Sequence, residues 1–376
     1  MDTTLRDGEQ NPFCTMYDNE KIEIAKMLEK LNVDIIEAGF AASKGNIEVM
    51  KEIASKIKKP YLCGLARATK QDIDATYDAF KKYDKRIVHI FVPTSDVQND
   101  AKLKKSEDEL IEMAASAVRY AAKYFQIIEF TPEDSVRSKF STLTKMCKAV
   151  ISEGAEVINI ADTVGYAMPQ EFGQLVKNIK QVVKQESDTV KVSAHCHNDY
   201  GMATANTYYA IQNGAGQVET TIWGIGERAG NCSLEQIIAL SLRKPRTFDT
   251  QIDSTKLYEA AKLVSRATGI KSDFAPIVGK SAFSHKSGIH QHAVVNDVNS
   301  YEAVNAKDFG RKSELIMGPC SGYHGVISKA QELGYTIDKT VAANIIIKMS
   351  NMVRQKIKRE FNDNDIRFML EVIHKS

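Results

Sequence analysis

The chain carries two histidines, His195 and His197, inside a stretch whose apolar and β-branched residues predict a strand. Residues i and i+2 of a strand point to the same face, so the two imidazoles should lie side by side. Such a pair is a typical ligand set for a divalent metal ion. A pair of buried structural histidines is the alternative interpretation.

Polar groups in other segments could complete a metal site. Asp7 and Asn231 would add a carboxylate and an amide oxygen to the imidazoles of His195 and His197. Four such ligands leave coordination positions open for substrate and water, which favours a catalytic ion over a structural one. We therefore expect metal-assisted chemistry at a carbon–carbon bond.

Arg6 and Glu133 are candidates for charge stabilisation and proton transfer. A guanidinium beside the metal carboxylate could stabilise an enolate or alkoxide oxygen, whereas an ion pair with Glu9 or Glu227 would be purely structural. Enolate formation needs a base, and Glu133 could supply it. The alternative for Glu133 is a surface carboxylate beside Arg137.

Four other side chains are weaker candidates. His290 is an acid–base candidate that must fold over the site or come from another subunit, because it lies far outside the strand region. Thr163 could donate to a substrate carboxylate or cap the following turn. His89 could contact a carbonyl oxygen or be a satisfied core histidine. Tyr301 could donate a proton, but a tyrosine in such a position more often packs against its neighbours.

Short apolar runs alternate with longer amphipathic segments, at roughly one strand–helix unit per 25–35 residues. The amphipathic segments predict helices between the strands, the last of them over Leu234–Leu242. The predicted strands are Asp2–Leu5, Val33–Gly39, Pro60–Ala66, Ile87–Val92, Ile127–Phe130, Val157–Ala161, Val190–His197 and Val218–Trp223.

Eight such units predict an α/β protein with a (β/α)8 barrel. Polar residues follow or end most of the strands, including Glu129 and Glu133 on one strand and Asp162 on the next. Catalytic groups of this fold gather at the carboxyl ends of the strands, so these residues should share one rim.

Beyond the barrel the pattern changes to a small, mostly helical region. Helices are predicted over 253–268, 325–334, 339–360 and 363–374, with a loop region between the first two. We expect the barrel over 1–246, a linker subdomain with the loop that carries His290 over 247–324, and a helical subdomain over 325–376.

The composition excludes several classes of protein. The net charge is +2, and no block of lysine or arginine exceeds two residues, so nucleic acid is not an expected partner. No apolar run is long enough to span a membrane, and the charged first residues do not fit a signal peptide. The six scattered cysteines suggest reduced thiols in the cytoplasm.

Eight motifs together resemble the 2-isopropylmalate synthase family, whose relatives include homocitrate and citramalate synthases. The resemblance extends from Asp2 to about residue 375. The motifs are D-T-T-L-R-D-G-E-Q (2–10), I-E-A-G-F (36–40), F-V-P-T-S-D (91–96), E-F-T-P-E-D (129–134), D-T-V-G-Y-A-M-P (162–169), H-C-H-N-D-Y-G (195–201), G-I-G-E-R-A-G-N (224–231) and S-G-I-H-Q (287–291).

The resemblance implies a metal-dependent barrel enzyme that condenses acetyl-CoA, its co-substrate, with a 2-oxo acid. It implies that the divalent ion (Mg, Mn or Zn) is bound by Asp7, His195, His197 and Asn231, and that Arg6 stabilises the enolate. It also implies that Glu133 and His290 transfer protons, the histidine coming from the partner in a homodimer. Thr163, His89 and Tyr301 match substrate-contacting or catalytic positions.

Among these relatives, the segments at 36–43 and 91–96 are closer to isopropylmalate synthases, which favours 2-oxoisovalerate as the acceptor. Homocitrate or citramalate synthesis is the alternative, because one or two pocket residues can switch the oxo acid. A CoA-ester lyase and a non-catalytic homologue are further alternatives. No counterpart of a C-terminal leucine-sensing domain is found, so we expect no leucine feedback.

Overall fold

The computed structural model describes residues 1–42 and 44–374. The chain divides into two compact units, Met1–Ser272 and Asp273–Ser376. The helix predicted over 253–268 belongs to the first unit, whereas the finer boundaries at 246 and 324 stay predictions. Ser43, part of a segment used to favour isopropylmalate synthases, lies outside the described residues.

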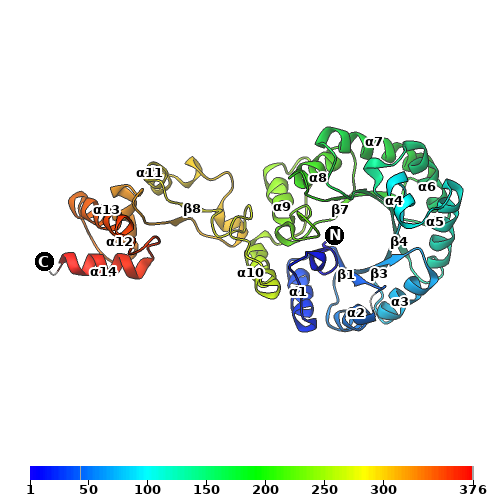
Figure 1. Cartoon of the computed structure of the whole chain (residues 1–376), viewed down its shortest axis with the longest axis horizontal. Coiled ribbons are helices and arrows are strands. Elements are labelled where there is room, and N and C mark those ends of the chain that lie inside the picture. Colours follow the sequence, from blue (N-terminus) through cyan, green and yellow to red (C-terminus); the bar gives the residue numbers. More distant parts are fainter. Residues whose placement is uncertain (43, 375–376) are drawn as a thin grey trace. The chain divides into compact units, whose positions relative to one another are not determined.

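The first unit is built on an all-parallel sheet of seven strands whose spatial order follows the sequence. Each strand is joined to the next by one or two helices, which lie outside the ring of strands (Figure 1). The strands are β1 (Ile35–Phe40), β2 (Tyr61–Arg67), β3 (Arg86–Pro93), β4 (Ile127–Glu133), β5 (Val157–Asp162), β6 (Lys191–Cys196) and β7 (Gln217–Val218).

Asp2 occupies the place of an eighth strand. It forms isolated parallel bridges to Ile36 on one side and Thr220 on the other, so the sheet closes into a ring. The predicted strand over Asp2–Leu5 is wrong beyond this bridge, because the Thr3 carbonyl accepts bonds from the N–H groups of Arg6, Asp7 and Gly8 and forms a turn. This turn brings Arg6 and Asp7 to the mouth of the barrel.

The last strand is also shorter than predicted. Only Gln217 and Val218 of this region are in β7, and Trp223, predicted to end a strand, has a left-handed backbone with φ of 43°. The strand predicted to end at His197 ends at Cys196, and His197 instead bridges to Asn231. The barrel prediction is confirmed, with these corrections to its strands.

The outer helices follow from local sequence signals. Helix α5 begins after Ser106, whose hydroxyl and N–H form a capping box with Glu109, and α7 has Pro169 in its first turn. The helices of this unit are α1 (Asp18–Lys30), α2 (Lys44–Lys56), α3 (Lys70–Phe80), α4 (Asp96–Lys102), α5 (Glu107–Ala121), α6 (Phe140–Ser152), α7 (Pro169–Glu186), α8 (Ala203–Gln212), α9 (Leu234–Arg243) and α10 (Leu257–Thr268).

The strands pack apolar residues against the helices and point polar ones into the barrel. In β3, Val88, Ile90 and Val92 belong to the main apolar cluster, whereas the alternating His89 makes buried hydrogen bonds to other barrel residues. This period of two predicts which strand residues can reach a common interior site.

The second unit has its own apolar core, which includes Val326, Ile345, Phe361 and Leu370. It contains a short parallel pair of strands, β8 (Ser284–His285) and β9 (Glu314–Leu315), with α11 (Gly288–Asn296) between them along the chain. Three packed helices follow: α12 (Tyr323–Glu332), α13 (Lys339–Arg354) and α14 (Asp363–His374). Across the described part of the chain, no helix has the length and apolar character needed to cross a membrane.

Candidate metal and active site

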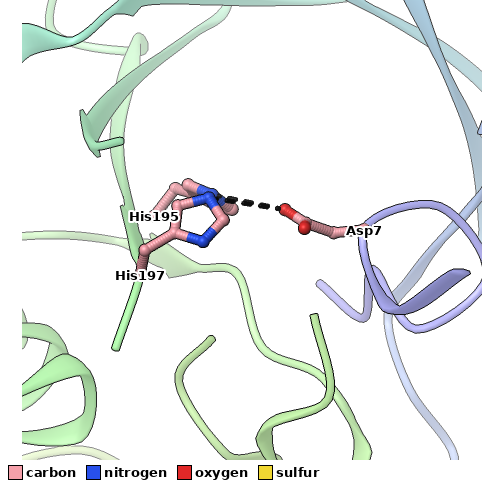
Figure 2. Close-up of side chains that lie close together, drawn as sticks. All are labelled: Asp7, His195 and His197. Atoms are coloured by element: carbon pink, nitrogen blue, oxygen red, sulfur yellow. Dashed lines mark hydrogen bonds and ion pairs between the residues drawn. The ribbon is translucent and has the colours of Figure 1, made fainter. Parts of the chain in front are cut away.

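Three predicted metal ligands meet at the mouth of the barrel. His195 comes from β6, His197 follows it, and Asp7 comes from the turn near the chain start (Figure 2). The Nε2 atoms of the two histidines are 3.1 Å apart, and Asp7 Oδ2 lies 3.5 Å from His195 Nε2 and 3.8 Å from His197 Nε2. Ligand atoms this close can bind one ion.

The fourth predicted ligand, Asn231, lies beside His197. The two backbones form an antiparallel bridge, and Asn231 is 4% exposed. A side chain at Gly226 would collide with it, because a Cβ there would lie 2.2 Å from Asn231 Nδ2. The glycine therefore makes room for the asparagine at the site.

The donor set fits a divalent ion. Asp7 Oδ1, His197 Nδ1 and Asn231 Oδ1 are buried, and none has a hydrogen-bond partner among the described residues. Buried polar atoms without partners are costly, and an ion bound here would satisfy the Asp7 and Asn231 oxygens. A carboxylate, two imidazoles and an amide oxygen can together bind Mg²⁺, Mn²⁺ or Zn²⁺.

Charge and burial set the protonation of these groups. Burial opposes ionisation of Asp7, but Arg6 and the two histidines hold the pKa of Asp7 below its usual range. Burial lowers the pKa of His197 to about 4, so its imidazole is neutral at neutral pH. An ionised carboxylate and a neutral imidazole are the forms that bind metal ions.

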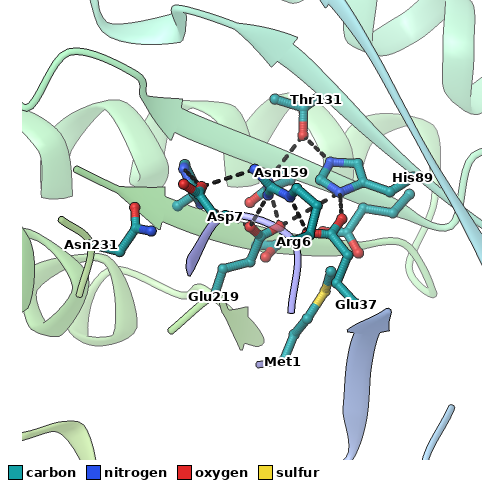
Figure 3. Close-up of polar contacts among 12 residues, drawn as sticks. Met1, Arg6, Asp7, Glu37, His89, Thr131, Asn159, Glu219 and Asn231 are labelled. Atoms are coloured by element: carbon teal, nitrogen blue, oxygen red, sulfur yellow. Dashed lines mark hydrogen bonds and ion pairs between the residues drawn. The ribbon is translucent and has the colours of Figure 1, made fainter. Parts of the chain in front are cut away.

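Arg6 lies inside a network of acidic side chains beneath the candidate metal site (Figure 3). Its guanidinium contacts Asp7 at 2.9 Å, Glu37 at 2.5 Å and Glu219 at 3.7 Å. The predicted alternative, an ion pair with Glu9 or Glu227, is wrong. Glu9 pairs with Lys21 instead.

His89 is a buried member of the same network. Its Nδ1 lies 2.8 Å from Glu37, and its Nε2 lies 2.6 Å from the Thr131 hydroxyl. Burial alone would lower the pKa of His89, but the hydrogen bond to Glu37 and nearby carboxylates raise it to about 9. His89 therefore carries a positive charge inside the barrel at neutral pH.

Glu129 does not lie at the rim, where the sequence had placed it. It is in the middle of β4 and fully buried, and both of its carboxylate oxygens accept bonds from Gln217 Nε2 at 3.0 Å. Asp162 is also structural, because its carboxylate accepts from the backbone N–H groups of Tyr166 and Ala167.

Glu133, the candidate base, ends β4 at the rim. One oxygen pairs with Lys102 at 2.8 Å, and the other is buried without a partner among the described residues. The predicted alternative, a surface carboxylate beside Arg137, is wrong because one Glu133 oxygen is buried and Arg137 binds Asp134. Asp134 has a left-handed backbone with φ of 64° and also bonds to Ser95, so the residue after Glu133 is firmly held.

Thr163 follows β5 on the same rim. Its hydroxyl oxygen accepts the N–H of Asp134 at 2.9 Å, rather than capping the turn after it. The hydroxyl proton therefore has no role in that bond and could be donated to a ligand.

A cavity of about 190 Å³ brings the barrel candidates together. Its lining includes Arg6, Asp7, His89, Glu133, Thr163, His195 and His197. An apolar part of the lining consists of Phe40, Leu65, Phe91 and Ala161. The cavity thus combines charged groups with an apolar wall.

The two remaining candidates, His290 and Tyr301, belong to the second unit. Their rings stack with centroids 3.9 Å apart, and both side chains are exposed. His290 lies on α11, whose position is set by contacts within this unit.

Sequence reasoning missed Glu37 and Glu219, which bind predicted site residues, and Asn159, which binds Glu219. Asn159 Nδ2 donates to Thr131 and Glu219, and Glu37 binds Arg6 and His89. Glu37 and Asn159 each interrupt an otherwise apolar predicted strand, and that signal could have identified them.

Two family descriptions match the chain: "HMGL-like" over residues 1–264 and "Homocitrate synthase post-HMGL domain-like" over residues 277–357. A 2-isopropylmalate synthase of Dictyoglomus turgidum is 46% identical over 97% of this chain and 73% of its own length. The 2-isopropylmalate synthase 1 of Caldanaerobacter subterraneus subsp. tengcongensis is 43% identical over 98% of this chain and 94% of its own.

Solved structures support the fold. The hydroxymethylglutaryl-CoA lyase of Pseudomonas aeruginosa aligns with a TM-score of 0.58 at 19% identity, over 71% of this chain and 91% of that one. At this identity the likeness concerns the barrel alone. The extent and identity of the sequence matches show that the chain belongs to the 2-isopropylmalate synthase family.

Proposed function

We propose that the chain catalyses the condensation of acetyl-CoA with 2-oxoisovalerate, which gives 2-isopropylmalate, a precursor of leucine. The observation that carries the proposal is the convergence of Asp7, His195 and His197, with unpartnered donor atoms, beside Arg6 in the barrel mouth. Relatives named 2-isopropylmalate synthase cover nearly the whole chain, which supports the same reaction here.

The metal ligands would be Asp7, His195, His197 and Asn231. A divalent ion held there supplies Lewis acidity toward the keto and carboxylate oxygens of a 2-oxo acid. The protein supplies the rest: an ionised Asp7, a neutral His197 and an arginine held by Asp7 and Glu37.

The protons and charge of the reaction have nearby acceptors. The methyl group of acetyl-CoA would lose a proton to the unpartnered oxygen of Glu133, and the carbanion would attack the keto carbon. The keto oxygen would gain negative charge near Arg6, and the Thr163 hydroxyl would donate to the substrate carboxylate. His290 would then give this oxygen a proton to form the product hydroxyl, and water would hydrolyse the thioester and release CoA.

The apolar wall of the cavity favours a branched aliphatic acid. Phe40, Leu65, Phe91 and Ala161 offer no cation for a second carboxylate, and Arg228 of the same lining is already paired with Asp199. An oxo acid with two carboxylates would leave one charge buried against apolar side chains, which is costly. Pyruvate would leave the same wall partly uncovered, so 2-oxoisovalerate fits the chemistry of the lining best.

We further propose that the enzyme is a homodimer in which His290 and Tyr301 serve the barrel of the partner subunit. The support is the resemblance of S-G-I-H-Q at 287–291 and the exposure of both side chains. In this arrangement residues 247–324 act as the linker with the trans-acting loop and 325–376 as a helical subdomain. The six free cysteines fit a reducing, cytoplasmic compartment.

Release of the CoA thiol from acetyl-CoA tests the function. The assay is run with 2-oxoisovalerate, 2-oxoglutarate and pyruvate, each with and without a chelator. We expect chelator-sensitive release that is fastest with 2-oxoisovalerate. Preference for 2-oxoglutarate or pyruvate would refute the proposed acceptor, and no release from folded, metal-supplemented protein would refute the reaction.

A further inference from the structure

Glu219 is a buried carboxylate, not itself a predicted metal ligand, that contacts the candidate ligand His195, Arg6 and the substrate cavity. It lies directly after β7, where its N–H donates to the Ala194 carbonyl at 2.9 Å and so extends the ladder toward β6. Its side chain is 2% exposed and points into the network drawn in Figure 3.

The two carboxylate oxygens of Glu219 have different partners. Oε2 lies 2.8 Å from His195 Nδ1 and 3.7 Å from Arg6 Nη2. Oε1 accepts from Asn159 Nδ2 at 2.9 Å. Two acceptor atoms therefore meet donors from three other segments of the barrel, and a neutral amide could not satisfy both sides at once.

The contact with His195 determines which ring nitrogen faces the metal site. A hydrogen on Nδ1, donated to Glu219, leaves the lone pair on Nε2, the atom that faces Asp7 and His197. A carboxylate behind a histidine ligand also increases the basicity of the ligating nitrogen.

The contact with Asn159 fixes the amide in one orientation. Its Nδ2 donates to Glu219 and to Thr131 at 3.0 Å, so Oδ1 remains without a partner among the described residues. Asn159 lines the same cavity as the candidate ligands. Glu219 thus orients both His195, a candidate metal ligand, and Asn159, which lines the substrate cavity.

We propose that Glu219 is a positioning residue that couples metal affinity to recognition of the oxo acid. It fixes the His195 tautomer, helps hold Arg6 in place and orients the Asn159 amide. The inference rests on the proposed function, because it assumes that an ion binds at His195 and that an oxo acid occupies the cavity.

Glu129→Gln provides a matched control for Glu219→Gln. Glu129 is also a fully buried carboxylate inside the barrel, but its hydrogen bonds are to Gln217. Both substitutions replace a buried carboxyl group by an amide and change the volume little. A difference between them therefore reports the contacts of Glu219 rather than the loss of a buried carboxyl group.

The test is a titration of the full-length chain with Co²⁺, followed by visible absorption, together with the KM for 2-oxoisovalerate at saturating Co²⁺. We expect Glu219→Gln to weaken Co²⁺ binding about 10- to 100-fold, to change the absorption band and to raise KM. Glu129→Gln should bind Co²⁺ within about threefold of wild type, since it leaves both His195 contacts intact.

Three outcomes separate the hypotheses. Equal Co²⁺ affinity and spectrum for wild type and Glu219→Gln would overturn the inference alone. Failure of wild type to bind Co²⁺ would overturn the proposed metal site and the inference with it. If Glu219→Gln does not fold, Glu219→Asp, which keeps the charge but is one methylene shorter, must show the same weakening, and wild-type affinity would overturn the inference.

Discussion

The two units of the chain hold their candidate catalytic groups in opposite ways. In the barrel, Asp7 and His195 are at most 8% exposed and contact other ionisable side chains. In the second unit, Tyr301 is 45% exposed, and its ring stacks on that of His290. Ion pairs therefore hold the candidate groups of the barrel in place, whereas the position of His290 depends on how α11 packs.

Backbone packing provides that position. Gly288, at the start of α11, approaches Gly322 so closely that a Cβ on Gly288 would lie 2.5 Å from the Gly322 nitrogen. Gln291, fully buried on the same helix, donates to the carbonyls of His285 and Ile316. The site in the barrel should therefore be sensitive to substitutions that change charge, and the second unit to substitutions that change side-chain volume.

The largest expected effect comes from removing a charge at the metal site. Asp7→Asn keeps the shape but loses the ionised ligand, so activity should fall about 10³-fold or more, equivalent to about 4 kcal/mol. The checks are CoA release and metal content of the purified protein. Asp253→Asn, an exposed helix cap in the same unit, is the control. Unchanged metal content in Asp7→Asn would contradict the ligand assignment.

Mixing two inactive variants tests whether the two units act together across subunits. Glu133→Ala and His290→Ala should each lower kcat by about 10²- to 10⁴-fold, as expected for loss of a general acid or base. Hybrid dimers would contain one intact site, so mixing with subunit exchange should restore roughly a quarter of wild-type activity. No recovery despite demonstrated exchange would exclude shared sites.

A change of volume should damage the second unit without altering the metal site. Gly288→Ala forces a methyl group against backbone, which should cost about 2–3 kcal/mol in unfolding free energy and reduce activity. Metal content should stay at the wild-type level. In Gly318→Ala, the new Cβ would meet only the flexible end of Lys286, so this control should be nearly neutral. Equal stability of the two variants would contradict the packing argument.

The sequence predicted much of the barrel because strand and helix signals are local. Period-two patterns identified the strand around His89, and the motif around His195 supplied two of the candidate metal ligands that the structure brings together with Asp7. The predicted strand over Asp2–Leu5 failed because a single carbonyl, that of Thr3, turns the chain after one bridge. Such a turn has no strong sequence signal.

Partners of polar residues were harder to predict than their positions. The structural alternatives for Arg6 and Glu133 were wrong, since their partners in the structure, Glu37 and Lys102, come from other strand–helix units. Glu219 escaped notice because β7 is only two residues long, so no alternation marks its face. Contacts of this kind depend on barrel closure rather than on local pattern.

The smallest predicted effect is a pH dependence of stability in the barrel. Burial lowers the pKa of His89, but Glu37 and the nearby carboxylates reverse this and raise it from 6.5 to about 9. The folded state therefore binds the proton more tightly than the unfolded chain. The resulting stabilisation is complete below pH 6.5 and is lost as the pH rises through 9.

We expect the unfolding free energy of wild type to fall by about 2 kcal/mol between pH 6.5 and 9.5 through this group, measured by urea denaturation. His89→Gln keeps a polar side chain at the position but cannot gain or lose that proton, so its stability should be lower at pH 6.5 and should change less over the same range. If the two proteins lose the same free energy with pH, the charge on His89 does not stabilise the network. The barrel would then depend on packing in the same way as the second unit.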